Sequence, residues 1–191
     1  MVILAAIFLA GCANSVKENQ PIDTTPQTEA KDGFLIPEVG VHISLPDEYT
    51  LTKSSEKNRR GSFVSYEINS SEQFPSFNEV QVFSEESIKQ FTSNCGVDND
   101  PCFFGDYPDL ESYNGQKSAF DKEENYKEYE LKKFGDRNYF VSNSQCNGDS
   151  CVIREYTTFI NDDKIDVWIA MDDATQTNEA DALFEKFEII E

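Results

Sequence analysis

The chain has 191 residues, of which 36 are Asp or Glu and 16 are Lys or Arg, so its formal net charge at pH 7 is −20. Binding to nucleic acid requires clustered Lys and Arg, and this charge balance argues against nucleic acid as a partner. It also disfavours peripheral binding to anionic lipid, whereas it favours solubility and would attract cations.

The first 11 residues, MVILAAIFLAG, are apolar or small and carry no charge. A membrane-spanning helix needs about 20 apolar residues, so this shorter run predicts the core of a signal peptide. The sequence LAGC at residues 9–12 resembles the lipobox of bacterial lipoproteins. That resemblance implies a diacylglyceryl group on the thiol of Cys12 and cleavage just before it. The alternative is a buried N-terminal strand or helix with an unmodified Cys12.

Residues 13–33 contain two prolines, many polar residues and no apolar periodicity, which is typical of a disordered linker. We therefore expect a signal peptide at 1–11, a lipidated Cys and linker at 12–33, and one ectodomain at 34–191. The last segment has the size of a single domain. The expected location is the bacterial cell envelope, where the protein would be lipid-anchored and extracytoplasmic.

The first half of the ectodomain has the period-2 alternation of β-strands. Ser84 is a predicted helix N-cap, because Glu85 and Glu86 follow it and favour the helix dipole. The helix is expected to end at Gly96, and residues 96–125 are expected to lack regular secondary structure. The predicted strands of this half are 41–45, 49–53, 62–69 and 77–83, with a hairpin tip at 54–61.

The second half predicts a β-meander and then a closing helix. The expected strands are 128–134, 138–145, 151–160 and 164–171, with turns around Gly135-Asp136, Asn147-Gly148 and Asn161-Asp162-Asp163. Thr177 is the expected N-cap of the closing helix. Its predicted apolar stripe consists of Ala180, Leu183, Phe184 and Phe187.

These elements predict an α+β domain, in which two short helices pack on an antiparallel β-sheet meander. The domain resembles the PsbP/Mog1-type fold of many small exported bacterial proteins. The resemblance is carried by VHISLPDEY at 41–49, KIDVWIAM at 164–171 and EADALFEKFEII at 179–190. The family usually has Trp in the opening motif, where this chain has Tyr49. The resemblance implies a role in binding or assembly, and no functional residue is carried over from it.

Four cysteines remain after Cys12, which is an even number in a chain predicted to be exported. We expect disulfides Cys95–Cys102 and Cys146–Cys151, because each would close a short loop rich in turn residues. Each would stabilise the domain by roughly 2–2.5 kcal/mol. Zinc is the rival interpretation, but the spacings C-x₆-C and C-x₄-C fit zinc sites poorly.

No catalytic motif stands out in the sequence. His42 is the single histidine and is expected to be a solvated strand residue. A pair of carboxylates acting as in glycosidases stays open, since any of the 36 acidic residues could contribute. A divalent-cation site is a further alternative, although no EF-hand loop is present. The candidate ligands for it are Asp98, Asp100, Asp162, Asp163 and Asp166.

Two sets of residues are candidates for contact with a partner. One is the basic cluster Lys57, Arg59 and Arg60, which would suit an anionic partner or simply form a charged hairpin tip. The other is a set of aromatic residues that would line a ligand groove or pack over the sheet edge, namely Phe103, Phe104, Tyr107 and Tyr113.

The sequence therefore predicts a membrane-anchored lipoprotein that acts as a non-catalytic binding or assembly module. Its partners would be the membrane, through the lipid, and an envelope protein or small ligand. No cofactor is expected. The alternatives are an extracytoplasmic hydrolase that uses carboxylates and a protein that binds divalent cations.

Overall fold

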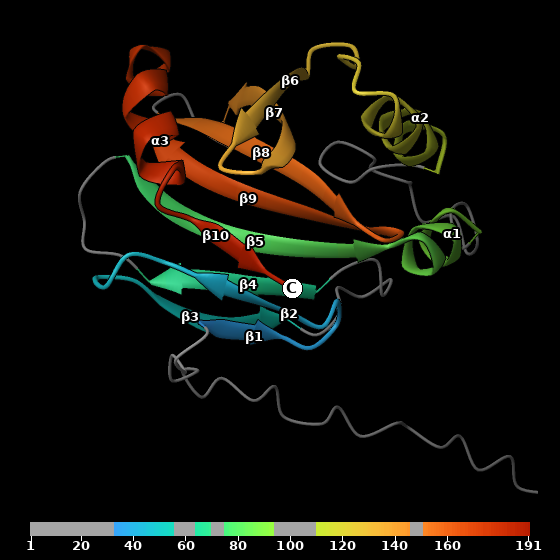
Figure 1. The fold of residues 1–191 in the computed structure, drawn as a ribbon, viewed down its shortest axis with the longest axis horizontal. Helices are drawn as coiled ribbons and strands as arrows, with labels where there is room; N and C mark the ends of the chain where they lie inside the picture. Colours follow the sequence, from blue (N-terminus) through green and yellow to red (C-terminus); the bar gives the residue numbers. More distant parts are fainter. Residues whose placement is uncertain (1–32, 56–63, 70–74, 94–109, 146–150) are drawn as a thin grey trace, which may run out of the picture.

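A computed structural model describes residues 33–55, 64–69, 75–93, 110–145 and 151–191. It confirms the α+β class, since antiparallel sheets and packed helices make up the described part of the chain (Figure 1). The larger sheet has the strand order β3 (Thr50–Ser55), β4 (Val64–Asn69), β5 (Ser76–Ser84), β9 (Asp163–Met171), β8 (Val152–Ile160), β7 (Arg137–Gln145) and β6 (Glu130–Phe134). The smaller sheet has the order β1 (Phe34–Ile36), β2 (Val41–Ser44) and β10 (Glu188–Ile190).

The larger sheet is built from two meanders that meet at β5 and β9. Helices α1 (Glu85–Ser93) and α2 (Leu110–Asp121) belong to the connection that leads from β5 to β6 at the far edge. A 3₁₀ turn, η2 (Ala174–Gln176), and helix α3 (Thr177–Phe184) follow β9. Because β5 and β9 are antiparallel, α1 and α3 lie at opposite ends of the sheet (Figure 1).

Two tight turns of the second meander lie where the sequence predicts them. Gly135 has φ +57° between β6 and β7, and Asn161 has φ +55° between β8 and β9. Gly and Asn are the residues that adopt this left-handed conformation most easily, which fixes the position of both turns. The register that follows pairs Phe134 with Arg137 and Ile160 with Asp163. The predicted turn 161–163 is therefore one residue too long, since Asp163 is already in β9.

Helix α1 begins where the sequence predicts, with Ser84 as its cap. The Ser84 hydroxyl accepts a hydrogen bond from the Ser87 amide at 3.0 Å. In return, the Ser84 amide donates to the Ser87 hydroxyl at 3.1 Å. This reciprocal pair satisfies two backbone donors, as a capping box does, with Ser87 in the place usually taken by Glu or Gln.

The prediction that 96–125 is irregular is wrong for residues 110–121, which form α2. Asn114 and Gly115 lie inside this helix, and both are weak helix formers, so the sequence gives little local signal for it. Tertiary packing supplies the reason for the glycine. A Cβ at Gly115 would lie only 2.5 Å from the hydroxyl of Tyr126. Tyr113, Gln116 and Ala119 form the buried side of α2.

The end of the chain also differs from the prediction. Thr177 is not the N-cap but the first residue of α3, and the cap residue, Gln176, makes no side-chain capping bond. Asp173 caps the preceding 3₁₀ turn instead, by accepting a hydrogen bond from the Thr175 amide at 2.7 Å. That turn, Ala174–Gln176, lies just before the predicted helical segment.

The closing helix is shorter than predicted, because α3 ends at Phe184 and residues 188–190 form strand β10. Ile189 lies opposite Ile43 of β2, and Phe34 of β1 pairs with the same Ile43. Strand β2 therefore has partners on both edges, and Ile43 is fully buried. The β-branched Ile189 and Ile190 suit a strand better than a further turn of helix.

Two hydrophobic cores lie on the two faces of the larger sheet. The first combines β9 residues such as Val167 and Ile169 with Ile43 of the smaller sheet and Phe184 of α3. The second lies on the other face and consists of Phe83, Ile88, Tyr113, Ala119, Phe140 and Phe159, which come from strands and from α1 and α2. Both faces of β9 are therefore covered, although its sequence alternates between apolar and polar residues.

Helix α3 is attached to the sheet by an ionic contact. Arg154 of β8 donates to both carboxylate oxygens of Asp181, at 2.6 and 3.0 Å, and Tyr156 donates to the same carboxylate at 2.8 Å. Burial raises the pKa of Asp181, but the hydrogen bonds from Arg154 and Tyr156 lower it overall. A bidentate pair of this kind fixes orientation as well as distance.

Candidate ligand-binding site

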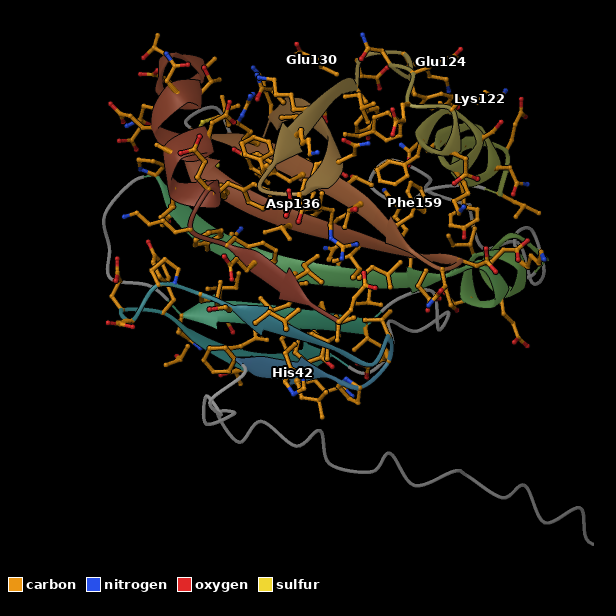
Figure 2. All side chains as sticks on the ribbon, viewed as in Figure 1. His42, Lys122, Glu124, Glu130, Asp136 and Phe159 are labelled. Atoms are coloured by element: carbon orange, nitrogen blue, oxygen red, sulfur yellow. The ribbon has the colours of Figure 1, made fainter. Side chains whose placement is uncertain are left out.

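A cavity of about 590 Å³ opens to solvent at the turn between β6 and β7. This volume falls within the range of small-molecule sites, roughly 300–1,000 Å³. Asp136 at the turn and Phe159 near the end of β8 both line it and are labelled in Figure 2. The remaining lining residues are Phe120, Phe134, Gly135, Arg137, Asn138, Tyr139, Glu185, Phe187, Glu188 and Ile189.

The cavity draws its walls from segments that are far apart in sequence. Phe120 comes from α2, Phe159 from β8, and Phe187 from the segment between α3 and β10. The β6–β7 turn contributes a continuous run, residues 134–139. The site therefore exists only after the second meander, α2 and the end of the chain have packed together.

Tyr139 is the most informative polar residue of the cavity. It is 3 % exposed, and its ring packs edge-on against Phe184 at 5.0 Å and Phe134 at 6.0 Å between centroids. Tyr139 lines the cavity, and its hydroxyl makes no hydrogen bond within the described part of the chain. Burial raises the pKa of Tyr139 to about 12, against a smaller opposing effect of the Arg137 charge. The residue is thus a neutral phenol that can donate to a ligand and accept from it.

The apolar walls of the cavity consist of aromatic rings that pack against other aromatic rings. Phe120 and Phe159 contact each other at 5.2 Å between ring centroids, and Phe187 stacks on Phe184 at 5.1 Å. Phe159 and Phe187 are both buried. With Phe134 and Tyr139, five aromatic rings line the cavity.

The charges of the lining are mostly negative. Asp136, Glu185 and Glu188 are exposed acidic residues of the rim, whereas Arg137 is the one positively charged residue among the described lining residues. The Arg137 guanidinium is paired with the Glu191 carboxylate, which offsets its charge. The cavity therefore combines aromatic walls, one unpartnered phenol and an acidic rim.

A second polar cluster lies in the sheet and contains Glu155, Lys164 and Asp166. The Lys164 ammonium lies 2.8 Å from Asp166 Oδ2 and 3.7 Å from Glu155 Oε1. It also lies 5.5 Å from the centre of the Phe83 ring, within cation–π distance. The exposed fractions of the three side chains are 14 % for Glu155 and 3 % for the other two. Burial, followed by the Asp166 charge, raises the pKa of Glu155 to about 7.

This cluster bears on the hydrolase alternative. The Thr157 hydroxyl lies 2.5 Å from Asp166 Oδ1 and 3.4 Å from Glu155 Oε1. The two carboxylates are therefore within about 6 Å of each other, near the spacing of about 5–5.5 Å in retaining glycosidases. However, neither residue lines the cavity, and Lys164 holds both of them. The arrangement fits a buried ion-pair network in the sheet.

The metal candidates within the described residues do not come together as a site. Asp162 is an exposed turn residue whose carbonyl accepts from the Tyr113 hydroxyl, and Asp166 is in the buried ion pair with Lys164. Burial and the Asp162 charge raise the pKa of Asp163. Among the described residues, no group of three or more His, Cys, Asp or Glu side chains is arranged to hold a metal ion.

Most other candidate residues lie outside the described residues. Cys151 is disulfide-bonded, but the predicted pairings stay predictions. Tyr113, expected in an irregular segment, is a buried residue of α2. His42 is half-buried on β2, away from Asp136 (Figure 2). The candidates outside the described residues are Cys12, Lys57, Arg59, Arg60, Cys95, Asp98, Asp100, Cys102, Phe103, Phe104, Tyr107 and Cys146.

The residues that line the cavity were not singled out by the sequence analysis. One signal is present: Tyr139 directly precedes two apolar residues, Phe140 and Val141, in a strand predicted from the sequence. Nothing local places Phe120 or Phe187 beside it, because those contacts are tertiary.

Comparisons with known proteins add no further identification, since the chain matches no protein-family model, no curated protein and no solved structure. The likeness to the PsbP/Mog1-type fold therefore stays a prediction. Within the described residues, no helix is both long and apolar enough to cross a membrane.

Proposed function

We propose that this protein is a lipid-anchored, extracytoplasmic binding module that takes a small organic ligand in the cavity at the β6–β7 turn. The observation that carries this proposal is the cavity of about 590 Å³ with five aromatic residues in its lining, among them Tyr139, whose hydroxyl makes no hydrogen bond within the described residues. Small-molecule sites are typically concave, lined mainly by apolar and aromatic side chains with a few polar groups, and the lining of this cavity has that composition.

The anchor rests on the sequence alone, through the LAGC motif and the polar segment after it. Two acyl chains give stable attachment, because each buried CH₂ group contributes about 0.8 kcal/mol. Expression with the native N-terminus in a bacterial host is expected to give a mature chain that begins at Cys12 and carries a diacylglyceryl group. Intact mass and peptide mapping would show this. An unprocessed chain with free thiols would contradict both the anchor and the envelope location.

The ligand site can be tested with N-phenyl-1-naphthylamine, a neutral fluorophore whose emission rises in apolar surroundings. We expect saturable binding to the wild-type protein. Glu188→Trp should reduce this binding at least about tenfold, equivalent to about 1.4 kcal/mol, by placing a large side chain at the cavity rim. Glu188 is exposed on strand β10, so the fold should tolerate the change.

The matched control is Glu67→Trp, which makes the same change at an exposed strand position outside the cavity. It should leave the affinity within about twofold of wild type, which is about 0.4 kcal/mol. If the wild-type protein fails to bind the fluorophore, or if both variants lose binding equally, the cavity is not the ligand site.

A further inference from the structure

The composition of the cavity also restricts the chemistry of the ligand, an inference that rests on the proposed function. Five aromatic rings line the cavity, and three exposed carboxylates stand at its rim. Among the described lining residues the only positive group is Arg137, which already has Glu191 as its partner. An anionic ligand would therefore meet like charges without a free cationic group to offset them.

From this arrangement we infer that the cavity selects organic cations: amines that carry a positive nitrogen on an apolar, preferably aromatic, body. The ring faces attract a cation through their quadrupoles, and the interaction strengthens where water is excluded. Acidic groups around a low-dielectric cleft focus the field and raise the local concentration of cations.

Each part of such a ligand has a counterpart in the cavity. The apolar body would contact aromatic lining residues such as Phe187, which is buried. The ammonium would lie toward Glu185 and Glu188, which are both exposed at the rim. An N–H of the ammonium or another polar group of the ligand would form a hydrogen bond with the Tyr139 hydroxyl. The net charge of −20 for the whole chain acts in the same direction over longer distances.

Three probes of similar size and different charge test this directly on the full mature chain. They are 2-phenylethylammonium, the neutral 2-phenylethanol and the anionic 3-phenylpropanoate, with dissociation constants measured by ligand-observed NMR at pH 7 and low salt. The cation should bind at least about tenfold tighter than the alcohol, and the anion should bind most weakly. Addition of 0.5 M NaCl should reduce this preference, because salt screens exposed charges.

Variants show whether the acidic rim and the Tyr139 phenol cause the preference for cations and the binding of polar groups. Glu185→Gln with Glu188→Gln should cut the cation preference about threefold or more and leave the affinity for the alcohol unchanged. Tyr139→Phe should weaken binding of 2-phenylethylammonium and of 2-phenylethanol, while the fluorophore still binds. Glu124→Gln is the matched control, because Glu124 is exposed beside the end of α2 (Figure 2) and does not line the cavity.

The outcomes separate this inference from the proposed function. If alcohol and cation bind equally, the cavity is a ligand site without charge selectivity and the inference is overturned. If the anion binds best, Arg137 is available to ligands and the inference is equally overturned. If neither the three probes nor the fluorophore bind, the proposed function itself fails.

Discussion

Lys164→Met is expected to lower the free energy of unfolding by about 3–5 kcal/mol at pH 8, the usual cost of removing one partner of a buried ion pair. The Lys164 ammonium holds the carboxylates of Glu155 and Asp166, and the change leaves the two acids facing each other. Small domains have a free energy of unfolding of about 5–15 kcal/mol in total, so the midpoint of urea denaturation should fall markedly.

The matched control is Lys132→Met, the same substitution at a lysine whose side chain is 31 % exposed, against 3 % for Lys164. The Lys132 ammonium lies 3.4 Å from Asp181 Oδ2, but a pair that is partly open to solvent contributes much less than a fully buried one, about 0–1 kcal/mol when exposed. Glu155→Gln in the Lys164→Met background should restore part of the loss, because it removes one of the two like charges. Equal effects of the two lysine substitutions would show that the buried cluster contributes little to stability.

The second large effect is a fall in stability between pH 5 and pH 8 that depends on Glu155. Its pKa is raised from the ordinary value of 4.5 to about 7 in the folded protein. The folded state therefore binds the proton more tightly than the unfolded state. The stabilisation is fully present below pH 4.5 and is lost as the pH rises through 7. A shift of this size corresponds to about 3 kcal/mol, at about 1.4 kcal/mol per pKa unit.

Glu155→Gln keeps the shape of the side chain and removes its titration. The variant should match the wild type at pH 5 and exceed its free energy of unfolding by up to about 3 kcal/mol at pH 8. Glu67→Gln, at an exposed position of β4, should leave the pH dependence as in wild type. Urea denaturation at a series of pH values gives the free energy of unfolding of the wild type and of both variants. A wild-type pH profile that persists in Glu155→Gln would contradict the role of this residue.

Strands with clear alternation and tight turns were predictable from the sequence. In β8 and β9 the local signals agree, because β-branched and aromatic residues are joined by a short polar turn. The cap at Ser84 was predictable for the same reason, since it depends on residues within one turn of helix. These features need no knowledge of the tertiary fold.

Elements that depend on distant partners were not predictable. Strand β10 is only three residues long, and it pairs with β2, which precedes it by more than 140 positions. Helix α2 contains Gly115, which weakens the helical signal but allows close packing of Tyr126. In both cases tertiary contacts override weak local propensity.

The same reasoning explains why the candidate site was missed. The cavity needs Phe120, Tyr139 and Phe187 together, and no local pattern connects them. The buried acids were missed for a related reason. Alternation in β9 suggests a solvated polar face, yet Lys164 and Asp166 are both buried because that face of the sheet is covered as well.

Chemical-shift mapping with the tyrosine rings isotopically labelled is the measurement that tests the ligand site most directly. On titration with 2-phenylethylammonium, the Tyr139 ring resonances should move in a saturable way, because the probe contacts its hydroxyl. Tyr49 should be unaffected, since it packs against Phe77 and does not line the cavity. Saturable shifts confined to other tyrosines, or no shifts at all, would contradict the assignment of this cavity as the binding site.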